Sequence, residues 1–234
     1  FFLLGNPNLK RTSIWNVDLR WDFFPRSGEL IAISYYYKHF SNPIFKQYNP
    51  GATIPELQFI NIKNAFITGI EIEFRKSLNF ISPQIKELSV SANFAYIYSR
   101  YNIPENEIAS SSFVDSGYTA KTRPFQGQSP YIVNLILAYD NDKIGLKSAL
   151  SFNISGKKLY NIALFATPDI YEDIRPMLNF KISKTFGKYF NVSFAAKNLI
   201  NPYFSRIQTH RGENFYAEKY QVGRSFIIGF DFKF

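Results

Sequence analysis

The fold follows from the stretch WNVDLRWDF, residues 15–23, in which apolar and polar residues alternate without a break. Successive side chains of a β-strand point to opposite faces of its sheet. A strand over Ile14–Phe23 therefore has one wholly apolar face and one wholly polar face. A soluble β-sandwich could contain one such strand, so the length and the repetition of the pattern decide between the alternatives.

The same alternation recurs to the end of the chain. It predicts further strands at residues 31–38, 66–75, 88–99, 131–139, 144–154, 178–186, 190–199 and 226–234. The segments run roughly 9–14 residues, enough to cross a bilayer at the usual barrel tilt, whereas strands of soluble proteins average about 5–6. We therefore predict an all-β fold, a transmembrane antiparallel up-and-down β-barrel, and keep the soluble sandwich as a remote alternative.

The composition agrees with a wall that meets lipid on one side and water on the other. Phe, Tyr and Trp make up 18% of the chain, yet the mean hydropathy is −0.17 and 19% of the residues are charged. No segment approaches the roughly 18 apolar residues that a membrane-spanning helix needs. The apolar faces carry almost no charge, and Lys184, near a strand end, is the exception.

The connections also alternate, between short turns and long segments. The long segments lie at residues 41–57, 102–127, 156–173 and 200–219. Because outer-membrane barrels have short periplasmic turns and longer extracellular loops, we expect these four segments to lie outside the cell and the chain to end on the periplasmic side. The pattern gives about nine strands, and bacterial barrels have even numbers. We therefore expect more barrel before residue 1, with Phe1–Leu4 as the end of a tenth strand.

The net charge of +9 has two interpretations. A nucleic acid or another anionic partner would need a basic cluster. The basic residues are instead scattered, with no run longer than Arg75-Lys76 or Lys157-Lys158. We therefore interpret the charge as that of solvated loops, turns and a barrel lumen, and predict no nucleic-acid partner.

Three motifs carry a resemblance to a known family. They are GNPNLK at residues 5–10, RPFQGQSPYIVN at 123–134, and PDIYE at 168–172 followed by KNLINP at 197–202. The chain then ends in an alternating aromatic strand with a terminal Phe234. In this order the motifs resemble the C-terminal β-barrel portion of TonB-dependent outer-membrane receptors, especially those of Bacteroidetes type. Arg11-Thr12 departs from the family pattern, which has Pro-Glu after the first motif.

The resemblance implies a barrel of about twenty-two strands in the Gram-negative outer membrane, closed by a plug domain. Residues 1–234 would be a C-terminal segment of that barrel, without the plug. Its implied partners are outer-membrane lipid, a small ligand or nutrient, and TonB with its inner-membrane energy complex, reached through the plug. A surface lipoprotein is a further candidate partner. The implied function is import of a scarce ligand, and the rivals are a passive porin-like channel and an outer-membrane scaffold for secretion or adhesion.

The sequence predicts no catalytic, cofactor or metal site. No nucleotide-binding or hydrolase motif is present. His210 with Glu213 offers only two metal ligands, which is too few. The carboxylates of Asp18, Asp22, Glu71 and Glu73 alternate with apolar residues, so we interpret them as lumen-facing charge ladders with Arg20 and Arg75. We therefore predict that the protein is not an enzyme.

The long segments hold the candidate ligand-binding residues. In 102–127 these are Tyr118 and Phe125, and in 200–219 they are Tyr203, Arg206, Arg211 and Tyr216. Aromatic rings mixed with Arg suit sugars, peptides or anionic chelates. Packing of the loops against one another explains the same residues about equally well, so no ligand class follows from the sequence.

Overall fold

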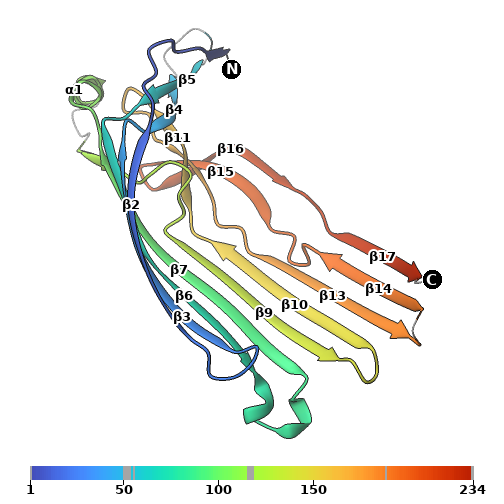
Figure 1. Ribbon diagram of the computed structural model, residues 1–234. Coiled ribbons are helices and arrows are strands. Elements are labelled where there is room, and N and C mark those ends of the chain that lie inside the picture. Colours follow the sequence, from blue (N-terminus) through green and yellow to red (C-terminus); the bar gives the residue numbers. More distant parts are fainter. Residues whose placement is uncertain (1, 50–53, 55, 115–118, 188, 233–234) are drawn as a thin grey trace.

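The chain folds into one long curved wall with a second, smaller sheet at one end (Figure 1). The structure is a computed structural model and describes residues 2–49, 54, 56–114, 119–187 and 189–232. The wall strands are β2 (Ser13–Phe23), β3 (Leu30–Ser41), β6 (Asn64–Ser77), β7 (Leu88–Asn102), β9 (Tyr131–Asn141), β10 (Leu146–Ser155), β13 (Met177–Phe186), β14 (Phe190–Lys197) and β17 (Ser225–Phe232). Each pairs antiparallel with the next, so β2 and β17 are the edges of the wall in the described part of the chain.

The register confirms the two faces predicted from the alternation. One row across the wall is apolar and joins Trp21, Ile33, Ile72, Phe94, Val133 and Ile154. The next row is mainly polar and joins Asp22, Ala32, Glu73, Asn93, Asn134 and Asn153. We call the face with Trp21 the outer face and the face with Glu73 the lumen face. The wall is thus a single sheet with different solvents on its two sides, as a membrane barrel requires.

One end of the wall, here called the turn end, carries short connections. Gly28 and Gly145 lie in two of these turns with φ values of +78° and +63°, a conformation that glycine adopts without strain. The longer connection, 78–87, holds two short 3₁₀ helices, η1 (Leu78–Phe80) and η2 (Pro83–Ile85). The hydroxyls of Ser77 and Ser82 accept hydrogen bonds from backbone N–H groups at the start of each helix. The two caps satisfy backbone N–H groups that would otherwise lack a partner in this longer turn.

The opposite end, here called the loop end, carries the second sheet. Its strands are, in spatial order, β1 (Phe2–Leu4), β5 (Glu56–Asn61), β4 (Ile44–Asn49), β11 (Lys158–Ala163), β12 (Ile170–Glu172), β15 (Tyr203–His210) and β16 (Glu213–Gln221). The helix α1 (Glu105–Val114) and the short strand β8 (Thr122–Arg123) lie at the same end (Figure 1). The four segments predicted as long loops are therefore correctly placed at one end, but much of their backbone is paired in strands. β1 also belongs to this sheet, where it pairs parallel with β5. For the described residues 2–4, the prediction of a tenth wall strand is therefore wrong.

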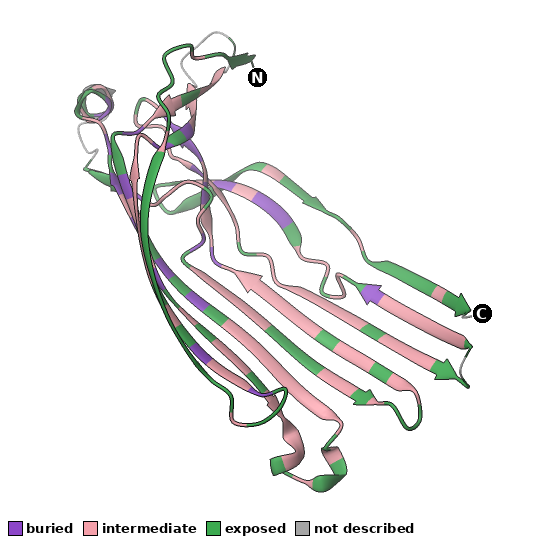
Figure 2. Ribbon diagram, in the orientation of Figure 1, coloured by how far each residue is buried: buried purple, intermediate pink, exposed green. Residues whose placement is uncertain are grey.

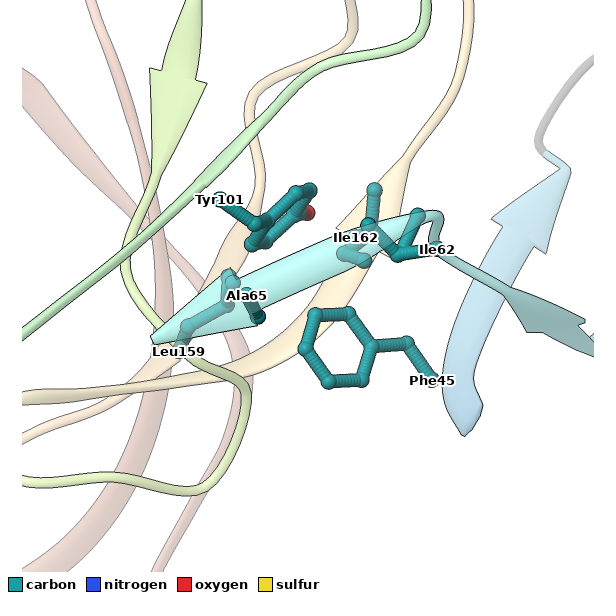
Figure 3. Close-up of a cluster of buried hydrophobic side chains, with 6 residues drawn as sticks. All are labelled: Phe45, Ile62, Ala65, Tyr101, Leu159 and Ile162. Carbon is teal, nitrogen blue, oxygen red and sulfur yellow. The ribbon is translucent and has the colours of Figure 1, made fainter. Parts of the chain in front are cut away.

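A hydrophobic core lies at the loop end, and a second buried cluster, Ile67, Ala95 and Ile97, lies on the adjoining wall strands β6 and β7. Figure 3 shows the buried side chains of the loop-end core, Phe45, Ile62, Ala65, Tyr101, Leu159 and Ile162. They come from β4, β6, β7, β11 and the segment just before β6, so the core joins the second sheet to the wall. Elsewhere the wall strands are largely exposed or half-buried (Figure 2). A sheet one layer thick has no interior of its own, and its outer face depends on lipid for burial.

The motif at residues 5–10 is fixed to the second sheet by side-chain amides. Asn6 donates from Nδ2 to the carbonyl of Phe59 at 2.9 Å, and its Oδ1 accepts from the backbone of Asn8 at 3.0 Å. Asn61 accepts from the backbone N–H of Lys10 at 2.7 Å and donates to its carbonyl at 3.0 Å. The motif therefore guides the chain from β1 to β2.

Candidate functional site

The lumen face of the first wall strands carries an ion-pair ladder. Arg20 contacts Asp22 on its own strand and Glu73 on β6, each at 2.8 Å, and lies 3.4 Å from the hydroxyl of Ser34 between them. The predicted charge ladder is thus confirmed for Arg20, Asp22 and Glu73, whereas Asp18, Glu71 and Arg75 form no ion pair among the described residues. Gly69 makes room for Tyr36 on this face, because a Cβ at Gly69 would lie 2.6 Å from the Tyr36 hydroxyl.

The segment 123–130 turns back over the lumen face near the loop end. Phe125 lies against the rings of Phe40 and Phe45, with ring centroids 4.7 and 4.8 Å away, and its backbone N–H donates to the hydroxyl of Ser99 at 3.0 Å. Gln126 hydrogen-bonds both the N–H and the C=O of Lys46, at 2.7 and 2.8 Å. The ring of Phe125, a candidate ligand contact, is thus used in packing that anchors this segment.

A buried charged cluster, which we call the Arg123 cluster, connects three separate segments at the loop end. Arg123 contacts Glu107 of α1 at 2.5 Å and Asp169, just before β12, at 2.6 Å. Asp169 also accepts the backbone N–H of Ala163 at 2.9 Å. Arg123 and Glu107 are each about 5% exposed, so the guanidinium and one of its partners are almost completely shielded from water. Charges buried this deeply are retained only when they are paired and hydrogen-bonded.

Burial and pairing shift the ionisation of the Arg123 cluster in opposite directions. Burial raises the pKa of the Asp169 and Glu107 carboxyls, and the adjacent guanidinium only partly offsets it. Burial lowers the pKa of Arg123, but the nearby carboxylates outweigh it and the pKa lies above its ordinary value. Arg123 therefore stays charged. As the pH falls, the carboxyls of Glu107 and Asp169 take up protons at a higher pH than ordinary carboxyls do.

A cavity of about 470 Å³ opens beside the Arg123 cluster. Lys157, Tyr171 and Thr209 line it together with Arg123 and Asp169. The Lys157 ammonium lies 5.1 Å from the centre of the Tyr171 ring. Burial raises the pKa of Tyr171 to about 12, so its hydroxyl remains a neutral hydrogen-bond donor. The cavity thus offers a cation, an aromatic ring and hydroxyl groups, a combination that suits a small ligand with negative charge and polar groups.

The hairpin of β15 and β16 carries the other candidate residues. Tyr203 and Tyr216 are more than half exposed, and the ammonium of Lys219 lies 4.8 and 4.1 Å from the centres of their rings. Arg206 stacks on the ring of Tyr160 at 3.7 Å and pairs with Glu218. Arg211 occupies the turn between the two strands with a φ of +50°.

The structure brings some of the predicted residues together and separates others. Tyr203 and Tyr216 share Lys219, whereas Arg206 is engaged with Tyr160 and Glu218, and Phe125 is packed in the core. Tyr118 lies outside the described residues. A role in ligand binding stays a prediction for all six.

Sequence reasoning missed the residues of the cavity. Arg123 opens the second motif and Asp169 lies in the third, so a charged residue in each motif was an available signal. Nothing in the sequence indicates that the two side chains meet, since 46 positions separate them. Tyr171 also lies in the third motif, whereas Lys157 belongs only to the short basic run Lys157-Lys158.

The described residues contain no group of three or more His, Cys, Asp or Glu side chains placed to hold a metal ion. Among the same residues, no helix is long and apolar enough to cross a membrane.

The chain matches known proteins by family and by fold. The model of the family described as "TonB dependent receptor-like, beta-barrel" matches residues 1–199. No curated protein sequence matches the chain. Solved structures with the same fold include the copper transporter OprC, with a TM-score of 0.67 at 14% identity over 97% of this chain and 33% of that one. The ferric enterobactin receptor PfeA of Pseudomonas aeruginosa, in complex with enterobactin, gives 0.61 at 15% identity over 97% of this chain and 32% of that one.

The FrpB iron transporter of Neisseria meningitidis gives a TM-score of 0.59 at 15% identity and is matched by 100% of this chain over 32% of its own length. The chain thus spans about a third of the length of these structures. At such identities the likeness shows the fold, which confirms the predicted class, a transmembrane β-barrel wall.

Proposed function

The chain belongs to the TonB-dependent receptor-like β-barrel family, and on this premise we propose that it forms part of a receptor that imports a scarce small ligand through a plugged barrel. Proteins of this family are transporters in the Gram-negative outer membrane and not enzymes. The observation that carries the proposal is that the wall has an apolar outer face and that its loop end folds into a second sheet with a cavity beside the Arg123 cluster. A passive channel needs the wall but has no need of the buried Arg123 cluster beside such a cavity.

The plug, the energy supply and the surface partner are part of the same proposal. We place residues 1–234 in the C-terminal part of the barrel and assign the plug to other parts of the receptor, through which TonB and its inner-membrane complex would act. The motif at residues 5–10 supports a receptor of Bacteroidetes type, and a surface lipoprotein would then be a candidate partner at the loop end. Outer-membrane lipid would cover the outer face.

The cavity supports a ligand with negative charge, such as a metal chelate. PfeA was solved with enterobactin and OprC is named as a copper transporter, so relatives in fold take up small metal-related cargo. In this chain Lys157 and Tyr171 line the cavity, and Tyr203, Arg206, Arg211 and Tyr216 lie on the β15–β16 hairpin at the same end. Tyr118 and Phe125 complete the proposed set.

Liposome swelling distinguishes this proposal from a passive channel. We expect the full-length receptor, reconstituted with its plug, to give no swelling in an isotonic sugar solution, because the plug closes the lumen. The same preparation after removal of the plug should swell. Swelling of the intact receptor at the rate of a general porin would support the passive channel instead.

Exchange of Lys157 tests the cavity. We expect Lys157→Gln to weaken binding of ferric enterobactin, used as the probe, about tenfold, since a hydrogen bond to a charged group contributes roughly 1.5–3 kcal/mol. Lys158→Gln is the matched control, because Lys158 is paired with Glu172 at 3.0 Å and is not among the residues that line the cavity. Titration of the purified full-length receptor by fluorescence quenching measures both. Equal affinities in the two variants would exclude Lys157 from the ligand site.

Cysteine labelling tests the orientation. Ser112→Cys on α1 and Glu213→Cys at the β15–β16 turn occupy exposed positions at the loop end, whereas Ser27→Cys occupies an exposed turn at the turn end. We expect a membrane-impermeant maleimide to label the first two on intact cells and the third only after lysis. The reverse result would invert the assignment of extracellular and periplasmic sides.

A further inference from the structure

The outer face of the wall bears a groove near the turn end. It is about 350 Å³ in volume and lies across β10, β13, β14 and β17. Its apolar lining is contributed by Leu146, Ile182, Phe186, Val192, Phe194 and Ile228. The register places these side chains on the face that continues the apolar row of Trp21, so the groove opens toward lipid. An acyl chain is the natural occupant of such a groove.

A single cation, Lys184, belongs to the same groove. It is opposite Leu146 on one neighbouring strand and Val192 on the other, so apolar residues flank it on both sides. Its ammonium donates a hydrogen bond to the carbonyl of Ile144 and lies 5.8 Å from the centre of the Phe186 ring. Within the described part of the chain, Lys184 makes no ion pair. A charge facing lipid is costly unless it reaches the polar interface and finds a partner.

The position of Lys184 along the strand places it at the boundary between acyl chains and head groups. It lies two residues before the end of β13, about 7 Å along a strand. Beyond it, Lys143, Lys147 and Asp142 line a second hollow at the turn end that Lys184 shares. Asp142 and Asp140 both pair with Lys147 at 3.0 Å, which leaves Lys143 and Lys184 as cations without a carboxylate partner among the described residues.

We propose that this groove is a binding site for an anionic glycerophospholipid of the periplasmic leaflet. An acyl chain would lie along the apolar lining, and the phosphate would sit beside the Lys184 ammonium, with Lys143 in reach of the head group. Charge complementarity favours an anionic over a zwitterionic head group, because the latter carries its own cation. The proposal rests on the membrane orientation of the wall and is independent of which ligand the receptor imports.

The site would give the phospholipid a role in seating the C-terminal strands. β13, β14 and β17 all contribute to the groove, and β17 is an edge of the wall in the described part of the chain. A lipid held there contacts three neighbouring strands at once and neutralises the one charge that those strands present to lipid. Wild-type receptor should therefore retain anionic lipid through purification.

Native mass spectrometry of the full-length receptor in detergent, titrated with phosphatidylglycerol, tests the proposal. We expect Lys184→Leu to weaken the tightest phosphatidylglycerol binding at least tenfold. Leucine suits an outer face, so this variant should fold. Lys181→Leu is the matched control, because Lys181 lies on the lumen face of the same strand and should leave lipid binding unchanged. Lys184→Arg should retain binding, since it preserves the charge.

Three results would overturn the proposal. The first is equal phosphatidylglycerol affinity in the wild type and Lys184→Leu. The second is wild-type binding of phosphatidylcholine as tight as that of phosphatidylglycerol, which would show that the charge is not recognised. The third is that Lys184→Leu weakens the binding of lipid A, the anchor of the outer leaflet, and leaves phosphatidylglycerol binding unchanged. That result would assign the groove to a different lipid on the other side of the membrane.

Discussion

Replacement of Ile228 by Arg is expected to remove most folded receptor from the outer membrane. Ile228 lies near the middle of β17, is 65% exposed on the outer face, and is paired with Phe194. An Arg on the lipid face of a barrel costs about 2–4 kcal/mol at mid-depth. Phe230→Arg, two residues further along the same face, should have a similar but smaller effect because it lies closer to the turn end.

The neighbouring residue supplies the control for this experiment. Ile227 is the same residue type, lies on the lumen face opposite Ala195, and should accept Arg with much less loss. Asp231→Asn, also on the lumen face, should be mild. The folded fraction can be measured from the heat-modifiable band of outer-membrane preparations on a detergent gel. Equal losses in Ile227→Arg and Ile228→Arg would contradict the assignment of the faces.

Replacement of Arg123 by Met is expected to release α1 from the loop end while the wall stays folded. The change leaves the carboxyls of Glu107 and Asp169 without their shared cation, although Glu107 is only 5% exposed. Removing one partner of a buried ion pair costs about 3–5 kcal/mol. Because α1 is joined to the core through this cluster, the lost free energy should lower the stability of α1 against local opening and leave the stability of the wall unchanged. Hydrogen exchange of residues 105–114 in the full-length receptor should rise sharply, and exchange in β6 and β7 should not.

Arg20→Met is the matched control, since Arg20 also pairs with two carboxylates, Asp22 and Glu73. The Arg20 side chain is 42% exposed, and an ion pair that water reaches this easily contributes little to stability. We expect little change in exchange anywhere. If Arg123→Met behaved like Arg20→Met, the Arg123 cluster would have no part in holding α1.

The sequence determined the wall almost residue by residue. The strand predicted at Ile14–Phe23 is observed at Ser13–Phe23, and that at 178–186 is observed at Met177–Phe186. Alternation is a local property, because the pleat of a strand sends each successive side chain to the opposite face. A one-residue shift of register would turn a whole apolar row toward water, so the pattern excludes such a shift. A two-residue shift would keep both faces, and the pairs that meet across strands are therefore known only from the structure. Phe234, which completes the terminal pattern, lies outside the described residues.

Only the tertiary structure decided the loop end. Most of its strands are short, their polar residues follow no period, and β4 pairs with β11 across more than a hundred positions of sequence. The contacts that matter there, between Arg123, Glu107 and Asp169 or between Phe125 and Phe45, depend on where distant segments fold back. No local rule encodes such meetings. A membrane requires every wall strand to alternate apolar and polar residues, and this alternation can be read directly from the sequence. The cavity beside Arg123, in contrast, forms only when distant segments meet in the folded chain.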